Sequence, residues 1–211
     1  MSEHHHFHKN EPYYKRAKKQ GYRARSAYKL LDIQNKFNIF KRAFYILDLG
    51  CAPGSWLQVA KNFAEENLTK YKDQFYHRDH YKIMGVDIKK VSPIKDIHII
   101  RADFTKIEIQ MQIDSYFDSK LDLILSDASI KKIGNKFTDH MKQIRLCNEI
   151  LKLVELNLKN KGNLVIKAFQ GSDFESFTKK MKQIFKFLKS YKPKSSKKKS
   201  NEIYLVGLSK L

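Results

Sequence analysis

Cysteine is scarce in this sequence, and its scarcity excludes two kinds of site. The chain of 211 residues contains Cys51 and Cys147 as its only cysteines, and neither belongs to a CxxC pair. A disulfide framework and a structural zinc site are therefore not expected. This cysteine content fits a reducing compartment.

The sequence also lacks long apolar runs and a recognisable leader. No stretch approaches the roughly 18 apolar residues of a membrane span, and the chain does not open on a signal peptide. The first residues include Glu3 and Glu11 and no arginine before Arg16, which is unlike a transit peptide. We expect an intracellular protein that does not bind membranes, with cytoplasm, nucleolus and mitochondrion left open.

Acidic residues are few relative to basic ones. Lysine and arginine number 42 against 22 aspartates and glutamates, so the formal charge is +20. The hydrophobic content of 42% is nevertheless that of a globular chain. A surplus of this size favours an acidic polymer as partner, and the alternative is simply a basic protein.

Short apolar segments alternate with helical patterns along the chain, which favours an α/β fold with a mostly parallel sheet. A basic, aromatic segment at 13–40 becomes helical from Ser26, which could cap that helix. The predicted strands are 44–49, 83–86, 97–100, 121–125, 164–169 and 203–208, and the further predicted helices are 56–64, 138–158 and 174–188. Residues 65–80 and 189–201 are predicted to be loops.

Four aspartates stand at or just after the ends of predicted strands: Asp48, Asp87, Asp103 and Asp127. Open parallel sheets bind ligands at this edge. Asp87 can accept hydrogen bonds from both ribose hydroxyls of a nucleoside, and Asp103 can accept one from an adenine amino group.

The segment Asp48-Leu-Gly-Cys-Ala-Pro-Gly-Ser-Trp56 follows a predicted strand and opens a helix. Its glycines allow the backbone to approach a ligand closely. It matches neither GxGxxG nor GxxxxGK[ST], which disfavours a dinucleotide or a nucleoside triphosphate.

This loop resembles the cofactor loop of the FtsJ (RrmJ-like) ribose 2′-O-methyltransferases. GYRARSAYKL, LSD, VIKAFQG, KPKSS and NEIYLVG also match the family in order, so the resemblance extends from about Tyr13 to the end. It implies a Rossmann-like class I methyltransferase domain at 13–211 after a flexible tail at 1–12, with seven strands of which the last is antiparallel, and helices on both faces. The implied cofactor is S-adenosyl-L-methionine, which becomes S-adenosyl-L-homocysteine. The implied cofactor contacts are Gly50, Gly54, Trp56, Asp87, Asp103 and Asp127.

The resemblance also implies a catalytic tetrad, formed here by Lys29, Asp127, Lys167 and Glu202. A ribose 2′-hydroxyl must lose its proton as it attacks the methyl carbon, and lysine can take that proton only when it is neutral. Burial and a neighbouring like charge can lower a lysine pKa by about 3–5 units. We therefore expect Lys167 to be the general base, with Lys29 supplying the like charge, Asp127 orienting the hydroxyl or a lysine, and Glu202 holding a lysine in place. No metal is required.

One departure from the family follows Asp127. The usual Asp-Met-Ala-Pro-Asn stretch is replaced by Asp127-Ala-Ser-Ile-Lys-Lys-Ile-Gly. The family's loop helps to shape the pocket for the target nucleotide, so the nucleotide preference is left open.

Two basic stretches, 9–29 and 189–199, lie on either side of the tetrad residues in the sequence, and the first also carries tyrosines. Lysine and arginine can bind the phosphates of RNA, and tyrosine rings can stack on its bases. We expect the segment 13–40 to contact RNA, and large-subunit rRNA, free or in a pre-ribosomal particle, to be the substrate of a monomeric enzyme. The alternatives are the tRNA anticodon loop, with a possible helper subunit, and, more distantly, a non-catalytic RNA-binding or ribosome-assembly protein.

Overall fold

A computed structural model describes residues 12–71, 79–131, 133–197 and 200–211. The predicted flexible tail lies almost entirely outside these residues, as does part of the predicted loop at 65–80. Within the described part, no helix has the length and apolar character needed to cross a membrane.

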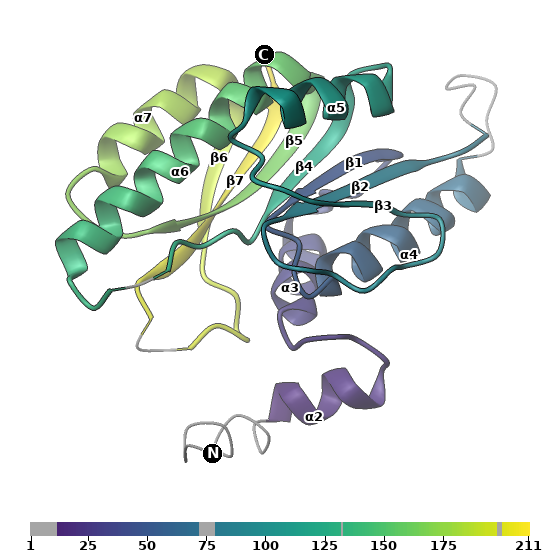
Figure 1. The fold of residues 1–211 in the computed structure, drawn as a ribbon, viewed down its shortest axis with the longest axis horizontal. Coiled ribbons are helices and arrows are strands. Elements are labelled where there is room, and N and C mark those ends of the chain that lie inside the picture. The colour runs from purple at the N-terminus through teal and green to yellow at the C-terminus, as the bar shows by residue number, and fades with distance from the viewer. Residues whose placement is uncertain (1–11, 72–78, 132, 198–199) are drawn as a thin grey trace.

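A seven-stranded sheet forms the centre of the protein (Figure 1). Its strands are β1 Tyr45–Leu49, β2 Lys82–Asp87, β3 His98–Arg101, β4 Leu121–Ser126, β5 Leu158–Phe169, β6 Phe185–Tyr191 and β7 Glu202–Lys210. Their order in the sheet is β3-β2-β1-β4-β5-β7-β6. The first five strands are parallel, and β7 is antiparallel to both of its neighbours. The structure thus confirms the expected sheet, including its antiparallel last strand.

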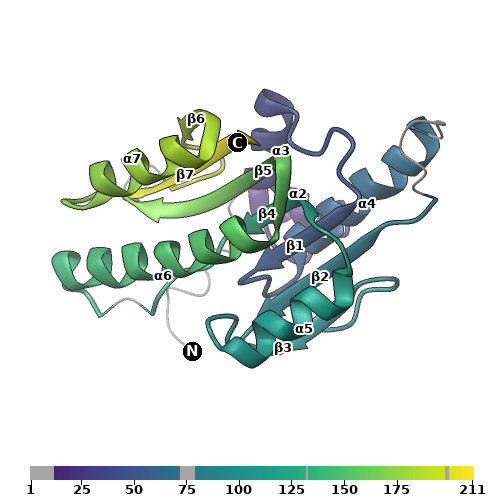
Figure 2. The same cartoon turned by 90° about the horizontal axis from the view of Figure 1, so that it is seen from above.

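Helices cover both faces of the sheet (Figures 1 and 2). The described helices are α2 Pro12–Lys19, which lies apart from the sheet beside α3, and α3 Ala27–Phe37, α4 Ser55–Lys70, α5 Ile107–Phe117, α6 Lys136–Asn157 and α7 Phe174–Ile184. The later three helices pack on one face and α3 and α4 on the other. Ile46 and Leu47 belong to different core clusters because successive side chains of a strand point to opposite faces. This is why every residue of β1 is buried.

The structure corrects several element boundaries. The helix predicted at 174–188 ends at Ile184, and β6 follows where a helix and then a loop were expected. Phe187 pairs with Leu208 of β7, so the hydrogen bonds of β6 come from a distant strand that local periodicity does not reveal. Helix α4 continues to Lys70, beyond its predicted end, and α2 and α5 were not predicted. Ser26 does precede α3, but its hydroxyl bonds the Ser55 hydroxyl instead of capping the helix.

The order of the strands creates a crevice. The chain runs from β1 outward through β2 to β3, and then crosses back to β4 on the other side of β1. Parallel sheets bind ligands at such a reversal, outside the carboxyl ends of the strands. Asp48, Asp87 and Asp127 meet there, since the charges of Asp127 and Asp87 both act on Asp48.

Asp122 anchors the opposite end of the central strands. Its Oδ2 accepts hydrogen bonds of 2.8 Å from the backbone N–H groups of Phe44 and Tyr45, and its Oδ1 forms an ion pair with Lys159. The carboxylate is buried and connects the starts of β1, β4 and β5.

We predict that Asp122→Ala lowers the free energy of unfolding by about 2–5 kcal/mol, because it leaves buried N–H groups without an acceptor. Urea denaturation measures the change. Asp114→Ala, which removes an exposed carboxylate on α5, is the control and should change stability by less than about 0.5 kcal/mol. Equal stabilities of the two variants would contradict the anchoring role.

Candidate active site

A cavity of about 390 Å³ opens at the crevice. Four of the predicted cofactor residues line it: Gly50, Asp87, Asp103 and Asp127. Phe104 and Leu146 add apolar surface. The cavity therefore combines carboxylates with a partly apolar wall, as a nucleoside-containing ligand requires.

Gly50 fixes how closely the loop after β1 approaches the rest of the site. Its N–H donates to the Val86 carbonyl over 2.8 Å, and its φ is +76°. A Cβ at this position would lie 2.6 Å from Cα of Ala128. Only glycine allows both this conformation and this approach.

The two strand-end aspartates are held by their own loops. Asp87 accepts the N–H of Ala52 on Oδ2 and that of Lys89 on Oδ1, both over 2.8 Å. Asp103 accepts the N–H of Thr105 over 3.0 Å and its hydroxyl over 2.8 Å, both on Oδ1. A carboxylate oxygen has more than one lone-pair site, so each group can still accept a hydrogen bond from a ligand.

Asp48 supports the fit of S-adenosylmethionine to this crevice. It is fully buried, and its carboxylate oxygens have no hydrogen-bond partner in the described part of the chain. Burial first, and then the charges of Asp127 and Asp87, raise its pKa well above the usual range. A crevice that brings three acids together favours a ligand that carries positive charge. The sulfonium and ammonium groups of S-adenosylmethionine meet this requirement.

Gly54 and Trp56 lie beside this cavity and outside its lining. Gly54 caps α4 with φ of +103° and packs against the Arg23 side chain. Trp56 is 2% exposed; its Nε1 donates to the Ser26 carbonyl over 2.8 Å, and its ring centre lies 5.9 Å from that of Tyr204. Their contact with the cofactor stays a prediction.

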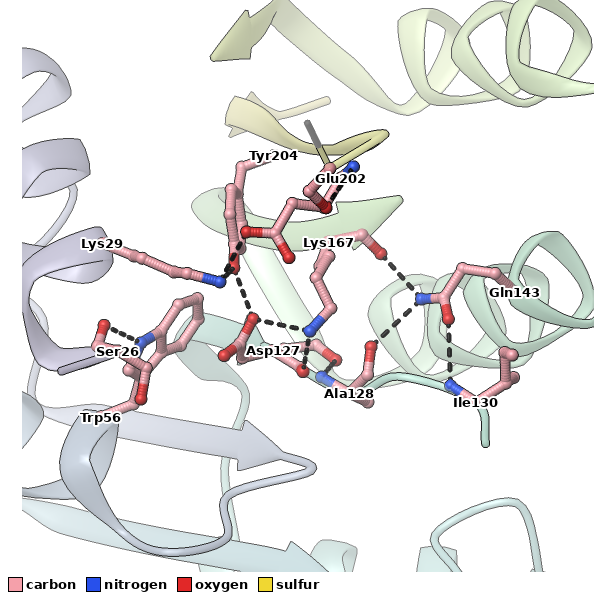
Figure 3. A network of polar contacts seen from close by, with 12 residues as sticks. Ser26, Lys29, Trp56, Asp127, Ala128, Ile130, Gln143, Lys167, Glu202 and Tyr204 are labelled. Atoms are coloured by element: carbon pink, nitrogen blue, oxygen red, sulfur yellow. Dashed lines mark hydrogen bonds and ion pairs between the residues drawn. The ribbon is translucent and has the colours of Figure 1, made fainter. Parts of the chain in front are cut away.

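The four residues of the predicted tetrad converge next to the cavity (Figure 3). Lys29 comes from α3 and its Nζ lies 2.7 Å from Oε1 of Glu202 at the start of β7. Lys167 comes from β5 and its Nζ donates to Oδ1 of Asp127 over 2.9 Å and to the Asp127 carbonyl over 2.7 Å. The tetrad thus consists of two ion pairs, Lys29 with Glu202 and Lys167 with Asp127.

Tyr204 joins these two ion pairs and was not predicted. Its hydroxyl donates to Oδ1 of Asp127 over 2.5 Å and accepts from Nζ of Lys29 over 3.1 Å. Burial, and then the charges of Asp127 and Glu202, raise its pKa well above the usual range. A signal was available in the sequence: Tyr204 follows Glu202 by two residues, so both point to the same face of β7.

Both tetrad carboxylates are stabilised in their ionised form. Burial raises the pKa of Asp127, but the charges of Lys167 and Lys29 and the Tyr204 hydroxyl outweigh it, so the net shift is downward. The pKa of Glu202 is likewise lowered, since Lys29 outweighs the effect of burial. Lys167 donates both of its hydrogen bonds to Asp127, so the position of its amine is set by that residue.

Gln143, a buried residue of α6, was also missed. Its Nε2 donates to the carbonyls of Ala128 and Lys167, each over 3.1 Å, and its Oε1 accepts from the N–H of Ile130 over 3.1 Å (Figure 3). It fixes the backbone of Lys167 relative to the atypical loop after Asp127. The sequence indicated only that Gln143 lies within a long helix.

Several side chains of the basic stretches form contacts within the protein. The rings of Tyr13 and Tyr22 pack against Tyr28, at 5.6 and 6.0 Å between centres. The Arg23 guanidinium donates to the carbonyls of Pro53, Ser92 and Pro93 and so braces the cofactor loop. Both stretches also carry lysines with exposed side chains, among them Lys15, Lys18, Lys19 and Lys194. Contact between these stretches and RNA stays a prediction.

We predict that Gly50→Ala weakens S-adenosylmethionine binding at least tenfold, because the new Cβ forces the loop away from Ala128. Isothermal titration calorimetry measures the dissociation constant. Gly21→Ala is a matched control: Gly21 has the same φ of +76° but no neighbouring atom within 4 Å of the added Cβ. Equal binding by both variants would show that the close approach is unimportant.

We predict that Tyr204→Phe destabilises the protein by about 1–2 kcal/mol at pH 7, since it removes a hydrogen bond to a charged group. Because folding lowers the pKa of Asp127, this carboxylate stabilises the fold above its unfolded pKa of about 3.9 and ceases to do so as pH falls through the lower folded value. The difference between variant and wild type should therefore shrink below about pH 4. Urea denaturation at several pH values measures it; a pH-independent difference would indicate that the Asp127 charge is not involved.

Comparison with known proteins agrees with this geometry. The family model for FtsJ-like methyltransferases matches residues 22–210. "Ribosomal RNA large subunit methyltransferase E" of Methanobrevibacter smithii is 37% identical over 95% of this chain and 90% of its own length. The protein of that name from Ehrlichia chaffeensis is 38% identical over 94% and 88%, respectively. A crystal structure from Plasmodium falciparum, described as a ribosomal RNA methyltransferase, is 32% identical with a TM-score of 0.74 and covers 90% of this chain and 99% of its own. The chain therefore belongs to the family of FtsJ-like methyltransferases.

Proposed function

We propose that this protein transfers a methyl group from S-adenosylmethionine to a ribose 2′-hydroxyl of large-subunit rRNA. The observation that carries the proposal is the tetrad of Lys29, Asp127, Lys167 and Glu202, assembled beside a cavity lined by carboxylates. Membership of the FtsJ-like family supports the reaction. The names of the curated relatives support rRNA as the substrate.

The tetrad residues have distinct roles in this proposal. S-adenosylmethionine supplies an electrophilic methyl group. When this group is transferred, the sulfonium sulfur leaves as a neutral thioether. Lys167, once neutral, accepts the proton of the 2′-hydroxyl, a role that typically contributes about 10²–10⁴-fold to the rate. Asp127 orients Lys167 through its carboxylate and its carbonyl. Glu202 and the Tyr204 hydroxyl hold Lys29, which brings a second positive charge to the site.

The cofactor would lie along the cavity between β1, β2 and β4. Asp87 would bind the ribose hydroxyls and Asp103 the adenine amino group. Gly50, which has no side chain, leaves room for the cofactor beside the loop. Gly54 shapes the turn into α4 and Trp56 supports α3, and their contact with the cofactor remains part of the proposal.

RNA would contact the basic surface around the tetrad. The charge of +20 supports a polyanionic substrate. Exposed lysines such as Lys15 and Lys18 on α2 and Lys194 after β6 would contact its phosphates. The segment 13–40 would belong to a single catalytic domain at 13–211. We propose that the enzyme acts as a monomer.

The test is methyl transfer from radiolabelled S-adenosylmethionine to purified rRNA, large ribosomal subunits and tRNA, each in a separate reaction. Label in a 2′-O-methylated nucleotide of large-subunit rRNA is expected, with a rate at least 10²-fold lower for Lys167→Ala. Lys152→Ala, an exposed lysine of α6, is the matched control and should retain full activity.

Three other outcomes would contradict parts of the proposal. Label confined to tRNA would replace the substrate. Full activity of folded Lys167→Ala would refute the assignment of the base. Binding of RNA without methyl transfer to any of the three substrates would favour a non-catalytic RNA-binding protein.

A further inference from the structure

A second cavity, of about 620 Å³, lies next to the tetrad. The loop after Asp127 contributes to both cavities, with residues 127–131 lining the cofactor cavity and Gly134 lining the second. The catalytic strands are β5 and β7, which carry Lys167 and Glu202. Phe169, the last residue of β5, and Asn201, which immediately precedes β7, also line the second cavity. The roles proposed above leave this cavity without a ligand.

The second cavity is directly connected to the catalytic strands. Phe169 follows Lys167 by two residues on β5, which corresponds to about 7 Å along a strand. Phe169 also pairs in register with Glu202 of β7, and Asn201 immediately precedes Glu202. If the 2′-hydroxyl of an RNA lies at Lys167 and Asp127, the base of that nucleotide or of its neighbour is therefore within reach of this cavity.

One wall of the second cavity is fixed by a buried histidine. Nδ1 of His140 donates to the Phe169 carbonyl over 3.1 Å, and Nε2 accepts the N–H of Asp173 over 3.0 Å. The backbone crosses this ring so closely that a Cβ at Gly171 would lie 2.5 Å from it. The wall is thus formed before any ligand binds, which reduces the entropic cost of binding.

A second part of the lining, at Gly134, is fixed by Asp139, also buried on α6. Its Oδ1 accepts the N–H of Ile133 over 2.9 Å and its Oδ2 that of Gly134 over 3.2 Å. The carboxylate is therefore occupied by the backbone of the loop. Phe137, the second residue of α6, also lines the cavity and yet is 67% exposed.

The groups in the lining suit a nucleobase. The phenyl ring of Phe137 offers a face for stacking, and the exposed amides of Gln170 and Asn201 can donate to and accept from a base edge. Lys136 adds a positive charge for a phosphate. The ring of Phe137 is largely exposed where it lines this cavity, and a base has the size and flatness to cover it.

We propose that this cavity binds a nucleobase of the RNA substrate, stacked on Phe137, and thereby places the target ribose at Lys167. The base belongs either to the methylated nucleotide or to its direct neighbour. This inference rests on the proposed function, because it requires RNA at the tetrad.

The first test compares Phe137→Ala with wild type on the RNA that wild type methylates. Loss of one stacked base should lower kcat/KM for RNA roughly 5- to 150-fold. The dissociation constant of S-adenosylmethionine and the melting temperature should not change, since Phe137 is exposed and lies outside the cofactor cavity. Phe137→Tyr should restore kcat/KM to within about threefold, because the ring face is retained.

Phe187→Ala is the matched control. It removes another exposed phenylalanine, 52% exposed, from the edge strand β6, and should leave kcat/KM unchanged. Equal effects of the two alanine variants, or none in Phe137→Ala, would overturn the base pocket while leaving the methyltransferase function intact. Failure of wild type itself to methylate any RNA would instead overturn the proposed function and the pocket with it.

The second test identifies the base. RNA oligonucleotides with an abasic ribose at the mapped methylation site, or at either adjacent position, are assayed with wild type and Phe137→Ala. Wild type and Phe137→Ala differ in rate only through the base that stacks on Phe137. When that base is missing from the RNA, both proteins should methylate the substrate equally slowly. If the difference persists for all three abasic substrates, the proposal is wrong.

Discussion

The site depends on the carboxylate of Asp127, whose Oδ1 accepts from both Lys167 and Tyr204. Through Tyr204 this acceptor also reaches Lys29 and its partner Glu202, so side chains from four elements share one network. A buried carboxylate is costly without such partners. Here the lysines and the hydroxyl more than offset burial and keep the pKa of Asp127 low. The same residue lines the cavity proposed for the cofactor, so it connects that cavity to Lys167, the proposed general base.

Helix α6 supports this arrangement from behind. Gln143 connects Lys167 to Ala128 and Ile130, and Asp139 holds the rest of the loop as far as Gly134. A loop that departs from the family sequence is therefore still fixed by buried polar side chains. It separates a cavity suited to the cofactor from one suited to a base of the substrate.

The sequence predicted the sheet well, and it singled out four tetrad residues that the structure brings together, because both leave strong local signals. Apolar runs buried on both faces, such as β1, indicate parallel strands, and the ordered motifs around Lys29 and Lys167 indicate the family. Strand β6 was mistaken for the end of a helix because its partner, β7, lies elsewhere in the chain. Gln143 and Tyr204 were missed for a related reason, since their importance arises from contacts with Lys167 and Asp127 that no local pattern encodes.

The sequence by itself determined the α/β class, the order of the motifs and the acids at the strand ends, since these follow from periodicity, glycine placement and residue chemistry. The tertiary structure decided which of these residues act together. It placed Trp56 below the tetrad and outside the cofactor cavity, engaged Arg23 with backbone carbonyls, and exposed Phe137 beside the catalytic strands. These outcomes depend on how α3, α6 and β7 pack against the sheet, and packing between distant segments is set by the whole fold.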